Sequence, residues 1–138
     1  YFHGSDFFEM RYPISLATTL ETFRNTASFT PRYSTYNRND MSEFEWTLMD
    51  NATIQLKPGF LDLLVRGSLR QNFMSREEDG EKIEEMEMDL DLSAGVKLQF
   101  TERLSSELIF GTFQNYRPDY ASEDYSDIYG SVSLTYDF

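Results

Sequence analysis

The stretch EEMEMDLDLSAGVKLQF, Glu84 to Phe100, decides the fold, because apolar and polar residues alternate along it without a break. From Met86 onward its even-numbered residues are all apolar, and its odd-numbered residues are mostly charged or polar. Successive side chains of a β-strand point to opposite faces of a sheet. The stretch therefore predicts one strand with an apolar face and an ionised face, well beyond the usual length of about five or six residues.

The same period of two recurs along most of the chain, and helical spacing with capping residues is not found. We therefore expect an all-β chain of about seven antiparallel strands. The predicted strands are Phe8–Leu16, Phe23–Ser34, Glu43–Leu56, Leu61–Phe73, Glu84–Phe100, Leu104–Phe113 and Asp127–Phe138. In the third of these, Asp50 interrupts an otherwise apolar side.

The predicted connections alternate in length. Short reversals are expected at residues 17–21, Lys57–Gly59 and Thr101–Arg103. Longer, polar or charged loops are expected at Asn37–Ser42, Ser75–Glu84 and Arg117–Asp124. Short turns at one end and long loops at the other are typical of an antiparallel up-and-down transmembrane β-barrel.

Length and composition exclude several classes of protein. With 138 residues the chain is one barrel domain or the C-terminal part of a larger barrel, and its 16% aromatic content argues against a disordered polyelectrolyte. The net charge of −12 argues against a nucleic-acid partner, which needs clustered Lys and Arg. The absence of Cys excludes disulfides, thiolate metal sites and cysteine catalysis.

Alternation alone leaves two orientations open. In a soluble lipid-binding barrel or sandwich the apolar side chains would face inward, and in a membrane barrel they would face lipid. The predicted strands are long for a soluble sandwich of this size. Aromatic residues also gather near strand ends, as the two aromatic girdles of a membrane barrel require: Tyr33, Phe44, Trp46, Phe60, Phe73, Phe100, Tyr136 and Phe138. We therefore favour the membrane barrel.

The last residues, YGSVSLTYDF, place Val132, Leu134, Tyr136 and the terminal Phe138 on one parity. This segment resembles the C-terminal signature strand of bacterial outer-membrane β-barrel proteins. The resemblance implies a location in the Gram-negative outer membrane, among its lipids and lipopolysaccharide. It also implies that these four residues form an assembly signal, recognised by the barrel assembly machinery.

The number of predicted strands bears on whether this chain supplies every strand of the expected barrel. In the family that the C-terminal strand resembles, both ends of a single-chain barrel lie on the periplasmic side, which requires an even number of strands. Seven is odd. We therefore expect that at least one strand precedes Tyr1 or that another chain supplies it, in a barrel of eight or more strands. The alternative is that two strands are counted as one, or that a further strand lies near residues 17–26.

Charged residues on the polar parity are the best candidates for a functional site. We expect them to line the lumen: Glu43, Glu45, Arg66, Arg70, Glu85, Glu87, Asp89 and Asp91. An acidic lumen favours cations, so the leading function is a passive, cation-preferring pore or a sheath around a partner. The alternative is a closed anchoring barrel in which these charges neutralise one another and the loops, with Tyr116, Tyr120 and Tyr125, make the contacts.

Enzymatic activity is not expected, and neither are a cofactor or a metal. The segment His3–Ser5 is superficially similar to the His and Ser of outer-membrane lipid hydrolases, which is the most distant of the hypotheses. Nucleophilic catalysis also needs an oriented base and a third group. His3 is the only His in the chain.

Overall fold

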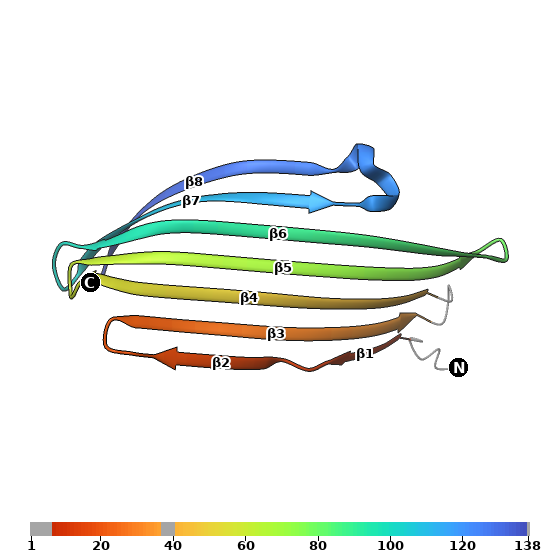
Figure 1. The fold of residues 1–138 in the computed structure, drawn as a ribbon, viewed down its shortest axis with the longest axis horizontal. Helices are drawn as coiled ribbons and strands as arrows, with labels where there is room; N and C mark the ends of the chain where they lie inside the picture. The colour runs from red at the N-terminus through yellow and green to blue at the C-terminus, as the bar shows by residue number, and fades with distance from the viewer. Residues whose placement is uncertain (1–6, 37–40, 138) are drawn as a thin grey trace.

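The computed structural model describes residues 7–36 and 41–137, which form one antiparallel sheet (Figure 1). Its strands are β1(Phe7–Arg11), β2(Ile14–Thr19), β3(Phe23–Tyr36), β4(Met41–Lys57), β5(Leu61–Glu78), β6(Glu81–Gln99), β7(Leu104–Tyr116) and β8(Tyr125–Tyr136). Their order across the sheet is β1-β3-β4-β5-β6-β7-β8, and β2 also pairs with β3. The prediction of an all-β, antiparallel up-and-down chain is thus confirmed. Within the described residues the sheet is not closed into a barrel.

The predicted first strand is divided into β1 and β2, although the two lie on one line beside β3. Met10 pairs with Tyr33 and Ile14 with Phe29, so the register continues across the break. At the break the Tyr12 N–H donates to the Pro31 carbonyl over 3.1 Å. Pro31 has no N–H to donate in return, and a second proline, Pro13, follows Tyr12. The sheet therefore has seven strand positions.

Register separates the side chains into two faces. Leu48 pairs with Leu69, and Leu69 with Leu90, on what we call the apolar face. One residue away, Arg70 pairs with Asp89 on the opposite side, which we call the polar face. The alternation in the sequence is therefore carried across the neighbouring strands in one register. The exception is the end of β4, where a bulge between Gln55 and Lys57 shifts the pairing with β5 by one residue.

The charged segment Ser75–Glu84 is not a long loop, contrary to the prediction. β5 and β6 continue to Glu78 and Glu81, and Asp79 and Gly80 alone form the turn, with φ values of 54° and 81°. Two central residues with positive φ are typical of a type I′ hairpin turn, for which Asp-Gly is a preferred sequence. The resulting hairpin projects beyond its neighbours at one end of the sheet (Figure 1).

The other two predicted loops have different outcomes. Pro118–Glu123 forms a short 3-10 segment between β7 and β8. In the segment Asn37–Ser42, Met41 and Ser42 already belong to β4, and residues 37–40 lie outside the described residues. The short reversal at Thr101–Arg103 is confirmed, and Thr101 Oγ1 accepts hydrogen bonds there from the backbone N–H groups of Arg103 and Leu104.

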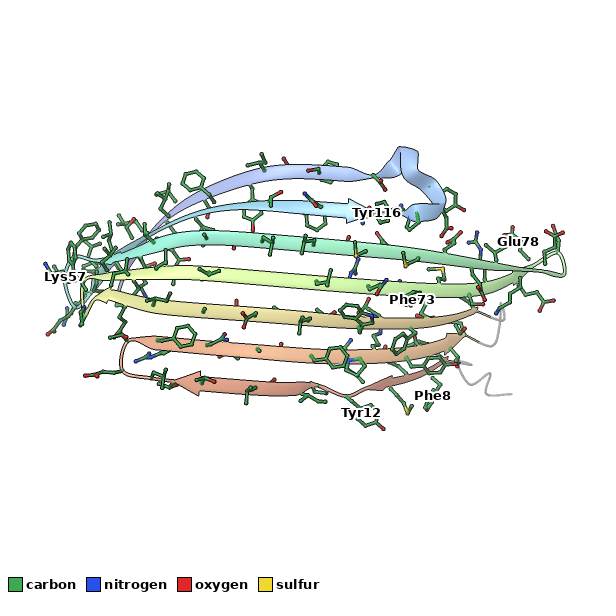
Figure 2. All side chains as sticks on the ribbon, in the orientation of Figure 1. Phe8, Tyr12, Lys57, Phe73, Glu78 and Tyr116 are labelled. Carbon is green, nitrogen blue, oxygen red and sulfur yellow. The ribbon has the colours of Figure 1, made fainter. Side chains whose placement is uncertain are left out.

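The sheet has almost no core of its own. Within the described ranges, the only buried residues are Leu64 and Ser34, because no second layer packs on either face. Side chains extend freely from the strands, and Phe8, Tyr12, Phe73 and Tyr116 lie toward the end that carries Glu78, far from Lys57 (Figure 2). No helix in the described part of the chain is long and apolar enough to span a membrane.

Candidate functional site

All eight residues predicted to line a lumen lie on the polar face. Their placement follows from register, since Glu43, Glu45, Arg66 and Arg70 belong to β4 and β5, and the four acidic residues Glu85 to Asp91 belong to β6. The same face carries residues that the sequence analysis did not single out as site residues: Ser34, Arg76, Glu107, Asn115 and Tyr129. The polar face is therefore the candidate functional site.

A row of alternating charges crosses this face toward the end of the sheet that carries the β5–β6 hairpin, and we call it the charge ladder: Glu9, Arg32, Glu45, Arg70 and Asp89. Arg32 lies 3.3 Å from Glu9 and 3.9 Å from Glu45, measured from guanidinium nitrogen to carboxylate oxygen. Arg70 lies 3.8 Å from Glu45, and its Nε donates to Asp89 over 2.8 Å. The charge ladder thus links β1, β3, β4, β5 and β6.

β7 extends the network through an amide. Asn115 Nδ2 donates to Asp89 over 2.6 Å and to Glu87 over 2.7 Å, so it bridges two carboxylates on the neighbouring strand. Arg117 Nη2 then donates to Glu87 over 2.9 Å. Two acidic side chains that would otherwise repel each other are held together by a neutral donor and a cation.

The 3-10 segment Pro118–Glu123 lies beside the first residues of β6, which extend beyond the end of β7. Asp119 Oδ2 accepts a hydrogen bond of 3.1 Å from the Met86 N–H. The Tyr120 hydroxyl donates to Glu85 Oε1 over 3.0 Å, and Arg76 Nη2 donates to the same oxygen over 3.3 Å. The hydrogen bond to the Glu85 carboxylate raises the pKa of Tyr120 above its usual value. The segment therefore supplies partners to an otherwise unpaired strand edge.

Below the 3-10 segment lies a hollow of about 320 Å³. Its lining includes Asn72, Met74, Glu87, Arg117 and Tyr120. The Asn72 Oδ1 atom is buried and has no hydrogen-bond partner among the described residues. The described residues contain no group of three or more His, Asp or Glu side chains placed to hold a metal ion.

Nearer the short turns, two contacts span three strands each. Arg66 on β5 reaches across β6 to Glu107 on β7, with 3.4 Å between nitrogen and oxygen. Tyr129 on β8 donates to Asp91 on β6 over 2.7 Å. Glu43 is held by a neutral partner, the buried Ser34 hydroxyl, at 3.4 Å. All eight predicted residues thus have polar partners, but they form several clusters and not one centre.

The remaining predicted residues lie elsewhere. Val132, Leu134 and Tyr136 lie together on the apolar face of β8 and are 75%, 71% and 52% exposed. Phe138 and the segment His3–Ser5 lie outside the described residues. Of the three tyrosines considered for loop contacts, Tyr120 and Tyr125 donate to carboxylates of this chain, Glu85 and Asp127.

Comparison of the chain with protein-family models, with curated proteins and with solved structures finds no match.

Proposed function

We propose that this chain is the wall, or part of the wall, of a β-barrel in the outer membrane of a Gram-negative bacterium, where it forms or helps to form a passive pore or a sheath around a partner. One observation carries the proposal: large apolar side chains are exposed over most of the apolar face, while the paired carboxylates of the polar face are partly covered by their partners. Leu92 and Val132 on the apolar face are 47% and 75% exposed, whereas the Asp89 and Glu45 side chains on the polar face are 15% and 19% exposed. This arrangement suits a barrel wall whose outer, apolar face contacts hydrocarbon and whose inner, polar face contacts water.

The edges of the sheet support closure with further strands. Edge backbone cannot remain unpaired in hydrocarbon, because each unsatisfied polar group there costs several kcal/mol. With seven positions in an antiparallel order, β1 and β2 at one edge run parallel to β8 at the other. An odd number of further strands, from another segment or another chain, would complete a fully antiparallel barrel. Outer-membrane lipids, lipopolysaccharide and the barrel assembly machinery are the partners that this proposal implies.

The polar face bears on the choice between an open pore and a closed anchor. Most of its acidic residues contact a guanidinium group, which weakens the field that a cation would meet in a lumen. Glu43 and Asp91 instead accept hydrogen bonds from hydroxyl groups. These two carboxylates are therefore the best candidates for a cation preference. The charge ladder, by contrast, favours the second candidate function, a closed anchoring barrel with a self-neutralised interior.

Orientation can be tested with the only Trp of the chain, Trp46, which lies on the apolar face. We expect phospholipids with brominated acyl chains to quench its fluorescence in vesicles, because lipid would surround the ring. A matched variant, W46F with T47W, moves the indole by one residue to the polar face. Its fluorescence should respond to aqueous acrylamide and little to the brominated chains. Equal quenching of both proteins by the lipid would contradict the proposal.

Conductance in planar bilayers distinguishes the two functions, once the full set of barrel strands is present. Stepwise currents with a preference for cations would support the pore. E43Q combined with D91N should then reduce that preference, whereas D119N in the loop is the matched charge control. If bilayers that contain correctly inserted protein show no current, the closed anchor is favoured.

The proposed assembly signal has its own test. Removing Phe138, or replacing Tyr136 with Ser, should slow insertion by the assembly machinery, as measured by the heat-modifiable migration of folded barrels in gels. Insertion at an unchanged rate would show that the resemblance of the last strand does not extend to its role.

A further inference from the structure

Two prolines lie at the same level of the sheet, next to Tyr12. Pro13 follows Tyr12 in the chain, and Pro31 on β3 is the residue whose carbonyl accepts the Tyr12 N–H. The other two prolines of the chain, Pro58 and Pro118, lie in a turn and in the 3-10 segment. A proline within a sheet removes one donor from the pairing of strands, so it matters on which side of the strand the donor is lost.

Toward β3, the missing donor is that of Pro31. The N–H and C=O groups of one residue point to the same side of an antiparallel strand. Because the Pro31 carbonyl faces Tyr12, its nitrogen does so as well, and it has no hydrogen to give to the Tyr12 carbonyl. On the other side of β3, pairing with β4 continues through Pro31, which lies opposite Trp46.

Toward the outer edge of the sheet, the missing donor is that of Pro13. The N–H groups of Tyr12 and Leu20 both donate to carbonyls in β3. The register with β3 does not shift along β1 and β2, and successive residues direct their backbone groups to alternate sides. The odd-numbered residues therefore direct their backbone groups to the outer edge: Phe7, Glu9, Arg11, Pro13, Ser15, Ala17 and Thr19. Pro13 divides this row into two groups of three residues.

The edge of the sheet at β8 has no such break. The Asp137 N–H donates to the Arg103 carbonyl on the side of β7. The Ser133 and Asp127 carbonyls likewise accept hydrogen bonds from side chains of β7. The even-numbered residues of β8 therefore direct their backbone groups away from β7, among them Ile128, Gly130, Val132 and Leu134. None of these four is a proline, so a strand that pairs with β8 meets an unbroken row of donors.

The break at Pro13 lies at a level where water can reach it. Pro31 pairs with Trp46, and the same row continues through β5 and β6 to Tyr116. Tyr12 lies toward the end of the sheet that carries Glu78 (Figure 2). Tyr and Trp favour the boundary between hydrocarbon and water. At this boundary water can bond the backbone groups that the two prolines leave without a strand partner, which is not possible in hydrocarbon.

We propose that the junction between β1–β2 and the strand that closes onto it is a seam in the barrel wall, where the wall opens laterally, starting at Pro13. The inference rests on the proposed function, because it requires a closed wall in a membrane. β2 supports it as well, since it has six residues whereas β3 to β8 have 12 to 19. The seam would join the lumen directly with the lipid.

Hydrogen exchange of the N–H groups at the two edges tests the seam, with the full set of barrel strands present in lipid nanodiscs. Exchange within the bilayer requires that the strands part and that water enters. Residue-resolved NMR should show exchange at Ser15 and Ala17 about tenfold faster or more than at Ile128 and Val132, because one donor is missing beside them. The rows of the sheet place these four residues at similar depth.

Three variants assign the cause of the difference. P13A adds an N–H that points to the outer edge, and it should slow exchange at Ser15 and Ala17 about tenfold. P58A is the matched control, because it makes the same change in a turn and should leave both rates unchanged. V132P is the converse change: it removes one donor from the β8 edge without touching the pairing with β7, and it should speed exchange at Gly130.

The possible outcomes separate this inference from the function on which it rests. If brominated lipids quench Trp46 but Ser15 and Ala17 exchange as slowly as Val132, the inference is overturned and the barrel wall stands. Fast exchange that P13A does not slow would show that Pro13 is not the cause, which also overturns the inference. If the lipids do not quench Trp46, or if both edges exchange without protection, the closed wall of the proposed function itself fails.

Discussion

Tyr129 on β8 passes over β7 to reach Asp91 on β6, and its hydroxyl donates a hydrogen bond of 2.7 Å to the carboxylate. The passage is open because the residue beneath the ring is Gly111, the direct partner of Tyr129 on β7. A Cβ at Gly111 would lie 2.4 Å from Tyr129 Cζ and 2.9 Å from the Leu92 carbonyl oxygen. One aromatic ring thus covers a glycine and ties three strands together on the polar face.

Replacing Gly111 with Ala should therefore destabilise the protein. The added methyl group displaces the ring and breaks its hydrogen bond to Asp91, which we expect to lower the free energy of unfolding by about 1–3 kcal/mol. Urea-induced unfolding from vesicles, followed by Trp46 fluorescence, measures the change. The matched control is G67A, where a Cβ meets only one side-chain atom at 3.4 Å. Equal effects of the two variants would show that the Tyr129 ring moves aside without cost.

Replacing Arg70 with Met should weaken the middle of the charge ladder. Glu45 and Asp89 both lose their shared cation, so two carboxylates remain close together on neighbouring rows. Because the Arg70 side chain is 42% exposed, we expect a loss of only about 1 kcal/mol, smaller still at high salt. R24M is the control, because Arg24 lies on the same face without a contact to any described carboxylate. A loss that does not depend on salt would point to packing by the Arg70 stem.

Replacing Gly80 with Ala should destabilise the projecting hairpin. Gly80 has a φ of 81°, a conformation that is unfavourable for a residue with a Cβ. We expect a loss of about 1 kcal/mol, visible as faster proteolysis or hydrogen exchange of the β5–β6 tip. D79N is the matched change at the neighbouring position, where φ is 54°, and should be nearly neutral because Asn tolerates this conformation.

The contact between Tyr120 and Glu85 should depend on pH in the alkaline range. The hydrogen bond needs a protonated phenol, and the Glu85 carboxylate raises the pKa of Tyr120. Its stabilising effect is therefore fully present below the usual tyrosine pKa of about 10 and is lost as pH rises through the higher folded value. NMR titration of the ring resonances would follow this ionisation. E85Q should bring the Tyr120 pKa back toward its usual value, and an unchanged pKa would exclude Glu85 as the cause.

Part of this arrangement was predictable from the residues alone. The period of two requires strands with one apolar and one polar face, whatever lies beside them. For example, it places Leu90 and Asp89 on opposite faces, as observed. The turns at Lys57–Gly59 and Thr101–Arg103 follow from local chemistry. The Asp-Gly sequence at Asp79 and Gly80 is likewise a local signal for a hairpin turn. These two residues were nevertheless predicted as part of a long loop, because charged residues surround them.

Other features depend on residues far apart in the chain. Pro31 interrupts the ladder at Tyr12, and this could not be predicted without knowing that the two are opposite each other. The pairs Arg66 with Glu107 and Tyr129 with Asp91 are separated by 41 and 38 residues. Their partners are set by the register of three strands, which the alternation within any one strand leaves open.

The sequence by itself determined that each strand has two chemically different sides, because side-chain direction alternates within a strand and needs no neighbour. Only the tertiary structure decided which charges meet and that Asp50 lies beside Ala27 and Gly67. The physical reason is that hydrogen bonding between strands sets the relative positions of residues distant in sequence, and side-chain contacts depend on those positions.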